Sequence, residues 1–240
     1  MSHINILGIP FCSVKQNEAS ERILYACLHN HNMPFTVVTP NPIMVMNAQK
    51  NEDLLSALSS ADLVLADGIG IIAASKRMGT PLPERVTGID TAYSVIEKLD
   101  DIEGSIYLLG AKPGVAEKAA QILSKSFPYL KIAGTHHGYF DDDGEIIKDI
   151  SNNSPNLLAV CLGSPRQEIW VYQNLAKLSG VGAVICLGGS LDVWAGEIKR
   201  APMLFIKLHL EWLWRMLREP KRFKELPKMI KFRCLTRKSR

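Results

Sequence analysis

The chain has 240 residues, of which 47% are hydrophobic and 22% are charged, with 17 Gly and 13 Pro. These proportions are ordinary for a folded protein and exclude collagen-like, low-complexity and disordered classes. The formal net charge of +4 is uneven, because residues 201–240 hold 12 Lys and Arg against three Glu, whereas residues 1–200 hold 16 basic against 21 acidic residues. The sequence predicts a body, 1–200, and a basic C-terminal appendage, 201–240, that either has an anionic partner or is a solvated end.

Apolar runs such as residues 157–162 and 181–187 are far shorter than the roughly 18 residues of a membrane-spanning helix. Residues 1–5 lack a basic region followed by a long apolar stretch, so we expect no signal peptide and a cytoplasmic location. The five cysteines are scattered without a Cys-x-x-Cys pair, which argues against a zinc site or a disulfide framework.

Short apolar runs alternate with helical stretches along most of the chain. The apolar runs predict strands at 4–9, 35–39, 63–66, 106–109, 131–133, 157–161 and 183–187. The stretches between them predict helices at 18–28, 52–58, 69–77, 91–99, 115–126 and 167–178. This alternation predicts an open, mostly parallel α/β sheet with helices on both faces.

Polar or glycine-rich segments follow five of the predicted strands. They are residues 39–42, 67–68, 110–114, 163–168 and 188–192. Open α/β sheets bind ligands outside the carboxyl ends of their strands. We therefore expect one crevice lined by five loops.

The loops 110–114 and 188–190 each place glycines between a strand and the next helix or turn. Glycine lets the backbone approach a phosphate, and N–H groups near a helix start favour an anion. Each loop alone is equally well explained as a helix cap, and neither has the Gly-Lys-Ser/Thr ending of a P-loop. Together in one crevice they favour a nucleotide diphosphate, with Asp192 accepting a ribose hydroxyl.

Asp67 ends an apolar strand and stands before Gly68-Ile69-Gly70-Ile71-Ile72-Ala73, which resembles a dinucleotide fingerprint. A carboxylate beside the pyrophosphate, and a position after the third strand, argue against a nicotinamide or flavin enzyme. Asp67 itself is either the N-cap of the following helix or a general base whose pKa is raised by partial burial. Arg85 is either a surface ion-pair partner or a phosphate ligand.

Asp141-Asp142-Asp143-Gly144 contains the Asp-x-Asp pattern that metal-dependent sugar transferases use, but its flanking glycines favour a solvated turn. His136 and His137 are adjacent and would point apart on a strand. We therefore expect no metal site.

Residues 203–219 predict a helix with Pro202 near its start and Pro220 after its end. One polar stripe of this helix comprises Lys207, Glu211, Arg215 and Arg218. Another face is apolar and comprises Leu210, Leu213, Trp214 and Leu217. Basic residues mixed with aromatic and aliphatic ones continue beyond Pro220, which favours an anionic membrane surface over a nucleic-acid arm or an ordinary packed helix.

Six motifs, in this order, resemble those of the WecG/TagA/CpsF glycosyltransferase family (family 26), and they cover residues 39–223. They are Thr39-Pro40-Asn41-Pro42, Ala66-Asp67-Gly68-Ile69-Gly70, Pro83-Glu84-Arg85-Val86-Thr87-Gly88, Gly163-Ser164-Pro165-Arg166-Gln167-Glu168, Gly188-Gly189-Ser190-Leu191-Asp192-Val193 and Leu210-Glu211-Trp212-Leu213-Trp214-Arg215.

The resemblance implies a Rossmann-like core with a C-terminal appendage that docks at the membrane and helps to close the active site. It also implies an inverting hexosyltransferase that needs no metal or other cofactor and moves a sugar from a UDP donor to polyprenyl-diphosphate-linked N-acetylglucosamine. The Thr-Pro-Asn-Pro form is most similar to the TagA type, which uses UDP-N-acetylmannosamine for teichoic acid. Relatives that use its uronic acid or glucose, for common antigen or exopolysaccharide, remain the alternative.

By match to the family motifs, Asp67 would be the catalytic base, Thr39 and Asn41 would position the acceptor sugar, and Arg85 and Gln167 would line the reaction centre. The donor-binding residues we expect are Gly110, Lys112, Gly163, Arg166, Gly188, Gly189, Ser190 and Asp192. The lipid diphosphate would meet Arg215, Arg218 and Arg222. The enzyme would be peripheral on the inner face of the cytoplasmic membrane and would bind no nucleic acid. The motifs do not determine whether it forms a homo-oligomer.

Overall fold

A six-stranded parallel sheet forms the centre of the computed structural model, which describes residues 2–29 and 32–238. The strand order is β4-β3-β8-β7-β5-β6, and every neighbouring pair is parallel. The strands are β3 (Phe35–Val38), β4 (Leu63–Val64), β5 (Ser105–Gly110), β6 (Lys131–His136), β7 (Leu157–Cys161) and β8 (Ala183–Cys186). The predicted open α/β sheet is confirmed. Because both faces are covered, β7 and β8 are buried along their whole length.

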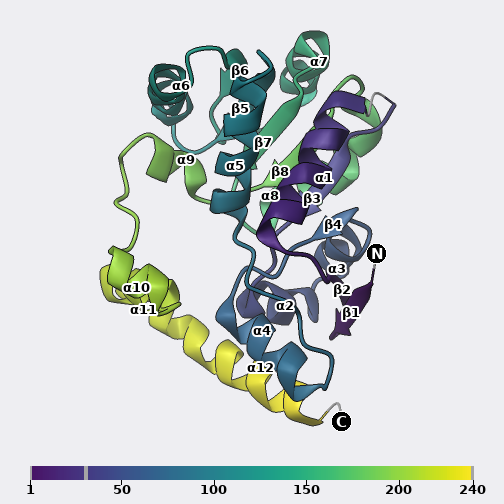
Figure 1. The fold of residues 1–240 in the computed structure, drawn as a ribbon, viewed down its shortest axis with the longest axis vertical. Coiled ribbons are helices and arrows are strands. Elements are labelled where there is room, and N and C mark those ends of the chain that lie inside the picture. Colours follow the sequence, from purple (N-terminus) through teal and green to yellow (C-terminus); the bar gives the residue numbers. More distant parts are fainter. Residues whose placement is uncertain (1, 30–31, 239–240) are drawn as a thin grey trace.

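Helices pack on both faces of this sheet. α1 (Gln16–His29) and α5 (Gly88–Asp100) pack together over β3 and β8, and lie in front of the sheet in Figure 1. α3 (Glu52–Ser59) packs with α8 (Arg166–Asn174), which continues into the 3₁₀ turn η1 (Leu175–Lys177). α6 (Val115–Ser126) contacts β5 and β6, and α7 (Gly144–Asn153) contacts β6. Because crossovers between parallel strands are right-handed, helices lie on one face where the chain moves one way along the strand order, and on the other face where it moves back.

The first predicted strand, 4–9, is wrong in its boundaries. The segment is a hairpin of β1 (His3–Ile6) and β2 (Ile9–Cys12), which pair antiparallel in a separate two-stranded sheet. Leu7 and Gly8 both have positive φ, and the Gly8 N–H donates to Asn5 Oδ1 at 2.9 Å. The apolar residues Ile4, Ile6, Leu7 and Ile9 concealed this turn, in which both central residues have the positive φ that is typical of a tight hairpin.

Several helices were not predicted, and two of them lie in the first 160 residues. α2 (Pro42–Ala48) begins directly after Asn41, whose Oδ1 accepts the N–H groups of Ile43 at 2.9 Å and Met44 at 3.1 Å. An Asn cap followed by Pro at the first helical position is a recognisable start signal. α7 begins after the acidic run, and Ile146, Ile147 and Ile150 form its buried face.

The predicted single helix at 203–219 is also wrong, because two helices form there. α10 (Met203–Lys207) ends at Leu208, His209 adopts φ +57°, and α11 (Glu211–Arg218) begins after Leu210. The rings of Phe205 and Trp214 pack 5.2 Å apart across this turn. Lys207 therefore does not continue the stripe of Glu211, Arg215 and Arg218 on one helix.

Beyond Pro220 the chain forms a 3₁₀ segment, η2 (Pro220–Glu225), and a long helix, α12 (Leu226–Lys238). α12 packs on α2 and α4 (Ile69–Arg77), and lies along one end of the molecule in Figure 1. Phe232 is only 2% exposed and joins the main core. Arg77 Nη2 donates to Thr236 Oγ1 at 3.1 Å, and Lys228 Nζ donates to Asn47 Oδ1 at 2.8 Å. The appendage is thus an ordered, docked element from 203 to 238.

The docking of the appendage does not decide the domain boundary at residue 200, which stays a prediction. Residues 239–240 lie outside the described residues. Within the described chain, no helix is both long enough and apolar enough to cross a membrane.

Candidate active site

The five predicted loops leave the same edge of the sheet. β3, β4, β5, β7 and β8 are parallel members of one sheet, so their carboxyl ends face the same way. A pocket of about 130 Å³ lies at the β3 and β4 end of this edge. The body supplies the loops at Asn41 and Asp67, with Arg85 beside them, and the appendage supplies α11 and η2. The pocket therefore has walls from both parts of the chain.

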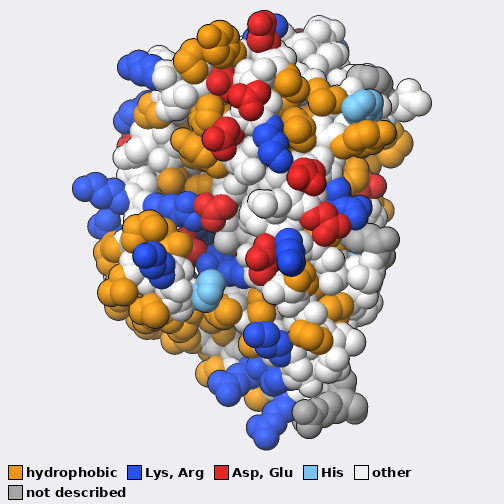
Figure 2. All heavy atoms as spheres, in the orientation of Figure 1, with side chains coloured by type: hydrophobic (Ala, Val, Ile, Leu, Met, Phe, Trp, Pro, Cys, Tyr) orange, Lys and Arg blue, Asp and Glu red, His pale blue; other side chains and the backbone are white. Residues whose placement is uncertain are grey.

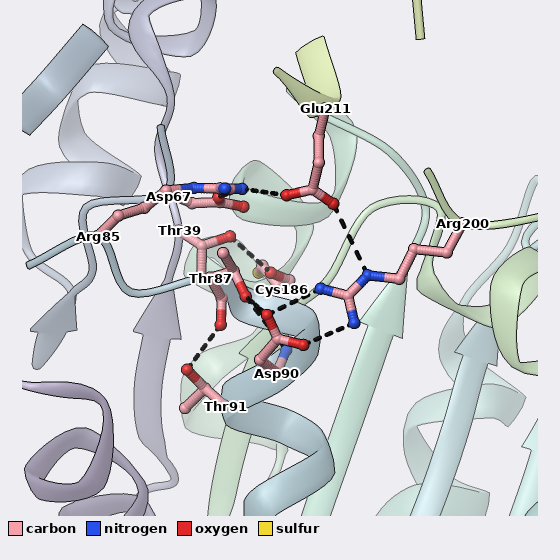
Figure 3. Close-up of polar contacts among 9 residues, drawn as sticks. All are labelled: Thr39, Asp67, Arg85, Thr87, Asp90, Thr91, Cys186, Arg200 and Glu211. Atoms are coloured by element: carbon pink, nitrogen blue, oxygen red, sulfur yellow. Dashed lines mark hydrogen bonds and ion pairs between the residues drawn. The ribbon is translucent and has the colours of Figure 1, made fainter. Parts of the chain in front are cut away.

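Asp67, the predicted base, lies beside Arg85, and Glu211 from α11 meets the same guanidinium (Figure 3). Arg85 Nη2 is 3.2 Å from Asp67 Oδ1 and 2.7 Å from Glu211 Oε2. The Arg85 and Glu211 side chains are only 14% and 12% exposed, whereas the Asp67 side chain is 31% exposed. One buried cation is thus shared by two carboxylates, and the carboxylate of Asp67 faces the pocket.

The ion-pair chain continues behind Glu211 through Arg200 and Asp90 (Figure 3). Arg200 Nε lies 3.7 Å from Glu211 Oε1, and its Nη1 lies 2.7 Å from Asp90 Oδ1. Asp90 also accepts the hydroxyl of Thr87, the residue that caps α5. Burial alone would raise the pKa of Asp90, but the hydrogen bonds from Arg200 and Thr87 outweigh it and lower this pKa. Along this series of ion pairs, from Asp67 to Asp90, negative and positive side chains alternate.

Burial raises the pKa of the Asp67 carboxyl above its ordinary value. The positive charges of Arg85 and Arg215 oppose this shift, and the negative charge of Glu211 adds to it. A carboxylate of raised pKa is a better proton acceptor than an ordinary aspartate. This balance of burial and charge is what a general base at neutral pH requires.

Thr39 and Asn41 follow β3 directly. Asn41 lines the pocket, and its Oδ1 accepts the N–H groups at the start of α2. Thr39 Oγ1 donates to the Cys186 carbonyl at 3.4 Å, and a side chain at Gly88 would come within 3.0 Å of Thr39. Asn41 thus shares the pocket with Asp67, whereas Thr39 does not line this pocket and packs between the start of α5 and the end of β8.

Gln167, predicted to line the reaction centre, is only 3% exposed and ties two loops together. Its Oε1 accepts the N–H of Gly163 at 3.2 Å and the N–H of Gly188 at 2.9 Å. Its Nε2 donates to Glu168 Oε1 at 2.7 Å. Burial raises the pKa of Glu168. The Gln167 amide therefore joins the carboxyl ends of β7 and β8, and Glu168 fixes which way the amide faces.

The other predicted donor residues lie around these two loops. Arg166 donates to the carbonyls of Gly138 at 2.5 Å and Phe140 at 3.1 Å, and its guanidinium stacks 4.6 Å from the Phe140 ring. Lys112 is exposed after β5, and Gly110 is buried against the backbone of Cys161. Arg166 thus fastens the loop that follows β6.

The last of the five loops leads into α9 (Ser190–Trp194). Gly189 is exposed, whereas Ser190 is buried and donates to the Leu187 carbonyl at 2.8 Å. Burial raises the pKa of Asp192. Gly110, Gly163 and Gly188 do not line the pocket at Asp67, so the sheet edge has two adjoining parts rather than one continuous cavity.

The three predicted appendage arginines are placed differently. Arg215 and Arg222 line the pocket, and Arg222 also pairs with Glu219 at 2.8 Å. Arg218 lies over the Trp214 ring at 5.4 Å and does not line the pocket. The structure therefore brings two of the three arginines to the candidate base.

The acidic run lies in an irregular segment before α7 and is solvated only in part, since Asp141 and Asp142 are exposed whereas Asp143 is partly buried. Asp142 accepts the Gly144 N–H at 3.0 Å. Asp143 accepts the indole N–H of Trp170 at 2.5 Å and the amide of Asn174 at 3.1 Å. In the described part of the chain, no cluster of three or more His, Cys, Asp or Glu is arranged to hold a metal ion.

Sequence reasoning missed the contacts of Glu211, Arg200 and Glu168. Glu211 was assigned only to a polar stripe, although it is the one acid in the first turn of α11. Arg200 and Glu168 carried no assigned role. No local signal marked Glu168, because α8 starts with the polar residues Arg166-Gln167-Glu168, which give no sign that this carboxylate is buried.

Residues 4–240 match the model of the family described as the glycosyl transferase WecG/TagA/CpsF family. The chain therefore belongs to this family of glycosyltransferases.

Three relatives bear the name N-acetylglucosaminyldiphosphoundecaprenol N-acetyl-beta-D-mannosaminyltransferase. The protein from Bacillus spizizenii is 36% identical over 196 residues, which cover 82% of this chain and 76% of that protein. The Bacillus subtilis protein is 34% identical over the same shares. The protein from Staphylococcus aureus strain MW2 is 32% identical over 224 residues, or 93% and 87% of the two chains.

Proposed function

We propose that this glycosyltransferase transfers N-acetylmannosamine from UDP-N-acetylmannosamine to N-acetylglucosamine carried on diphosphoundecaprenol. The names of the three relatives support this choice of sugar and acceptor. The product belongs to the synthesis of a teichoic-acid-type surface polymer. The observation that carries the proposal is the pocket in which Asp67 faces two arginines of the appendage, because it combines a base with cations suited to a diphosphate.

The reaction is a single displacement. An acceptor hydroxyl attacks the anomeric carbon while the bond from that carbon to the UDP oxygen breaks, and Asp67 takes the hydroxyl proton. Attack from the face opposite UDP inverts the anomeric configuration, so an α-linked donor gives a β-linked product. The raised pKa of Asp67 suits this step, since a stronger base accepts the proton more readily.

The leaving UDP is proposed to lie on the loops that Gln167 joins. Gln167 Oε1 accepts the N–H groups of Gly163 and Gly188 and so holds both loops in place. The further backbone N–H groups of these fixed loops are proposed to face the diphosphate, because preorganised donors stabilise developing charge without rearranging. Asp192, whose pKa is raised by burial, is proposed to accept a ribose hydroxyl. Lys112 is exposed nearby and supplies a cation for the diphosphate. The proposed reaction requires no metal ion.

The acceptor diphosphate is proposed to meet Arg215 and Arg222, which line the pocket. A lipid-linked acceptor also requires the pocket to open near a membrane. The helices of the appendage carry a series of exposed apolar side chains: Met203, Leu204, Leu208, Trp212, Leu217, Phe223 and Ile230. Figure 2 shows hydrophobic side chains gathered over α10 and α11 with Lys and Arg side chains beside them.

Apolar side chains flanked by basic ones suit the interface of an anionic membrane. We therefore propose that the protein is peripheral on the inner face of the cytoplasmic membrane, with α10 to α12 in contact with lipid. Lipid in contact with this surface would place the acceptor headgroup close to Arg215 and Arg222.

The test is release of UDP from a panel of UDP-sugars, with N-acetylglucosaminyl-diphosphoundecaprenol as acceptor and EDTA present. We expect turnover with UDP-N-acetylmannosamine that survives EDTA. Turnover confined to UDP-glucose or the uronic acid donor would overturn the sugar assignment. Activity lost in EDTA and restored by manganese would overturn the metal-independent reaction.

A further inference from the structure

The Arg85 guanidinium lies closer to the appendage than to the proposed base. Its Nη2 is 2.7 Å from Glu211 Oε2 but 3.2 Å from Asp67 Oδ1. Among the described contacts, Arg85 engages only one oxygen of Asp67, rather than making the two-bond pair that arginine forms with an unshared carboxylate. The second oxygen of Asp67 is therefore left to face the pocket.

We infer that Glu211 is a positioning residue for the base: it draws the Arg85 guanidinium away from Asp67, so that Asp67 keeps a free oxygen and its basicity. The inference rests on the proposed function, because it assumes that Asp67 accepts the acceptor's proton. Arg200 holds Glu211 in turn, since its Nε lies 3.7 Å from the other carboxylate oxygen.

The physical reason is competition for one cation. If Glu211 were neutral, Arg85 would lose its shorter ion pair and would close on Asp67 as its only strong carboxylate partner. A fully paired carboxylate is a weaker base, because a nearby positive charge stabilises its ionised form. Its lone pairs would also be occupied by guanidinium N–H groups. Both effects lower the rate of proton removal.

Other charged and titratable groups also face Asp67. Arg85 approaches from the body, Arg215 and Glu211 from α11, and His209, Arg222 and Glu225 line the same pocket. Glu211 raises the pKa of Asp67, whereas Arg85 and Arg215 lower it. Removing the charge of Glu211 therefore lowers this pKa, and the acid limb of the pH–rate profile moves to lower pH.

The experiment compares Glu211→Gln with the wild type in the full-length protein, by kcat/KM against pH with UDP-N-acetylmannosamine and the lipid-linked acceptor. Glutamine has almost the same shape and can still accept a hydrogen bond from Arg85, but it has no charge. We expect the acid limb to move to lower pH and the plateau to fall several-fold, while the Kd for UDP stays the same. A merely structural role would not move the acid limb.

Three further variants make the result specific. Glu18→Gln removes an exposed partner of Arg22 on α1 and is the matched control, for which we expect the wild-type profile. His209→Gln identifies any limb that belongs to the imidazole. Glu211→Asp keeps the charge on a shorter side chain, so its acid limb should stay near that of the wild type. If Glu211→Gln folds poorly, a displaced acid limb in Glu211→Asp would by itself overturn the inference.

The outcomes distinguish a failure of the role of Glu211 from a failure of the proposed function. If Asp67→Asn is inactive and Glu211→Gln has the wild-type profile, the role of Glu211 is overturned and the proposed function stands. If Asp67→Asn retains full activity, the base assignment fails and the role of Glu211 fails with it. If Glu211→Asp shifts the acid limb as far as Glu211→Gln does, packing rather than charge is responsible, which overturns the inference.

Discussion

The two parts of the sheet edge are held together in different ways. On the side of β7 and β8, the loops are joined by neutral hydrogen bonds within the body, which the N–H groups of Gly163 and Gly188 donate to Gln167 Oε1. On the side of β3 and β4, the contacts are ionic and link the body to the appendage through Arg85 and Glu211. The first arrangement depends only on the sheet, whereas the second exists only while α11 is docked.

This difference suits the two proposed substrates. A nucleotide donor needs a rigid cradle of backbone N–H groups, which the body supplies without the appendage. A lipid-linked acceptor would arrive from the membrane, so a pocket that shares its wall with the appendage, which we propose to contact lipid, would couple acceptor arrival to the geometry of the base. The donor side should therefore survive damage to the appendage, and the acceptor side should not.

The largest effect is expected from Asp67→Asn, which removes the proposed base from the ionic side. We expect kcat to fall by about 10²–10⁴-fold, the usual contribution of general base catalysis. The Kd for UDP, measured by calorimetry, should not change, because Asp67 lies outside the donor loops. An equal loss of UDP affinity would show that Asp67 also takes part in donor binding, which contradicts the division of the sheet edge into two sides.

The next largest effect is expected from Phe232→Ala, which removes the buried contact of α12 with the core. Truncating a buried Phe costs about 3–5 kcal/mol, and here the cost falls on the docking of α12. We expect faster hydrogen exchange in α11 and α12 and a raised KM for the acceptor, with UDP binding retained. Ile230→Ala, on the same helix but 63% exposed, is the control and should leave the exchange of α12 unchanged.

Gln167→Ala tests the donor side in the opposite direction. It leaves the N–H groups of Gly163 and Gly188 without their acceptor, at a cost of about 1–3 kcal/mol. We expect weaker UDP binding and a lower unfolding temperature, while the acid limb set by Asp67 keeps its position. Gln173→Ala, an exposed residue of the same helix, is the matched control. A shift of the acid limb would mean that the two sides are coupled through the sheet.

The smallest effect is expected from Lys224→Ala in η2. One basic residue at an anionic membrane contributes about 1 kcal/mol, so binding to vesicles containing an anionic lipid should weaken about fivefold. Lys125→Ala, on the exposed face of α6, should leave vesicle binding unchanged. Equal effects of the two variants would show that net charge, rather than the appendage surface, determines membrane binding.

The sequence predicted the sheet well because inner strands such as β5, β7 and β8 are buried on both faces, and continuous apolar runs mark such strands. The exact bounds of β7, α4 and α6 were predicted from local pattern alone. The break at His209 was missed because the apolar pattern continues through it. The docking of α12 was missed because its partners, α2 and α4, lie far away in the chain.

The candidate site divides in the same way. Asp67, Arg85 and Arg215 could be found by their motifs, and the structure brings them together. The carbonyl of Gln167 could not be assigned to two backbone N–H groups, because that requires knowing that β7 and β8 are neighbours. Glu211 could not be paired with Arg85, because no local pattern links residues 126 positions apart.

That separation also has a consequence during synthesis. Chains are made at about 5–20 residues per second, so Asp67 and Arg85 leave the ribosome on the order of ten seconds before Glu211. Throughout this interval the nascent body contains Asp67 and Arg85 without Glu211, the second carboxylate that pairs with Arg85. The donor cradle can mature first, and competence for transfer arrives only with the synthesis of α11. Under the proposed function, the order of translation thus delays catalysis until the appendage has been made.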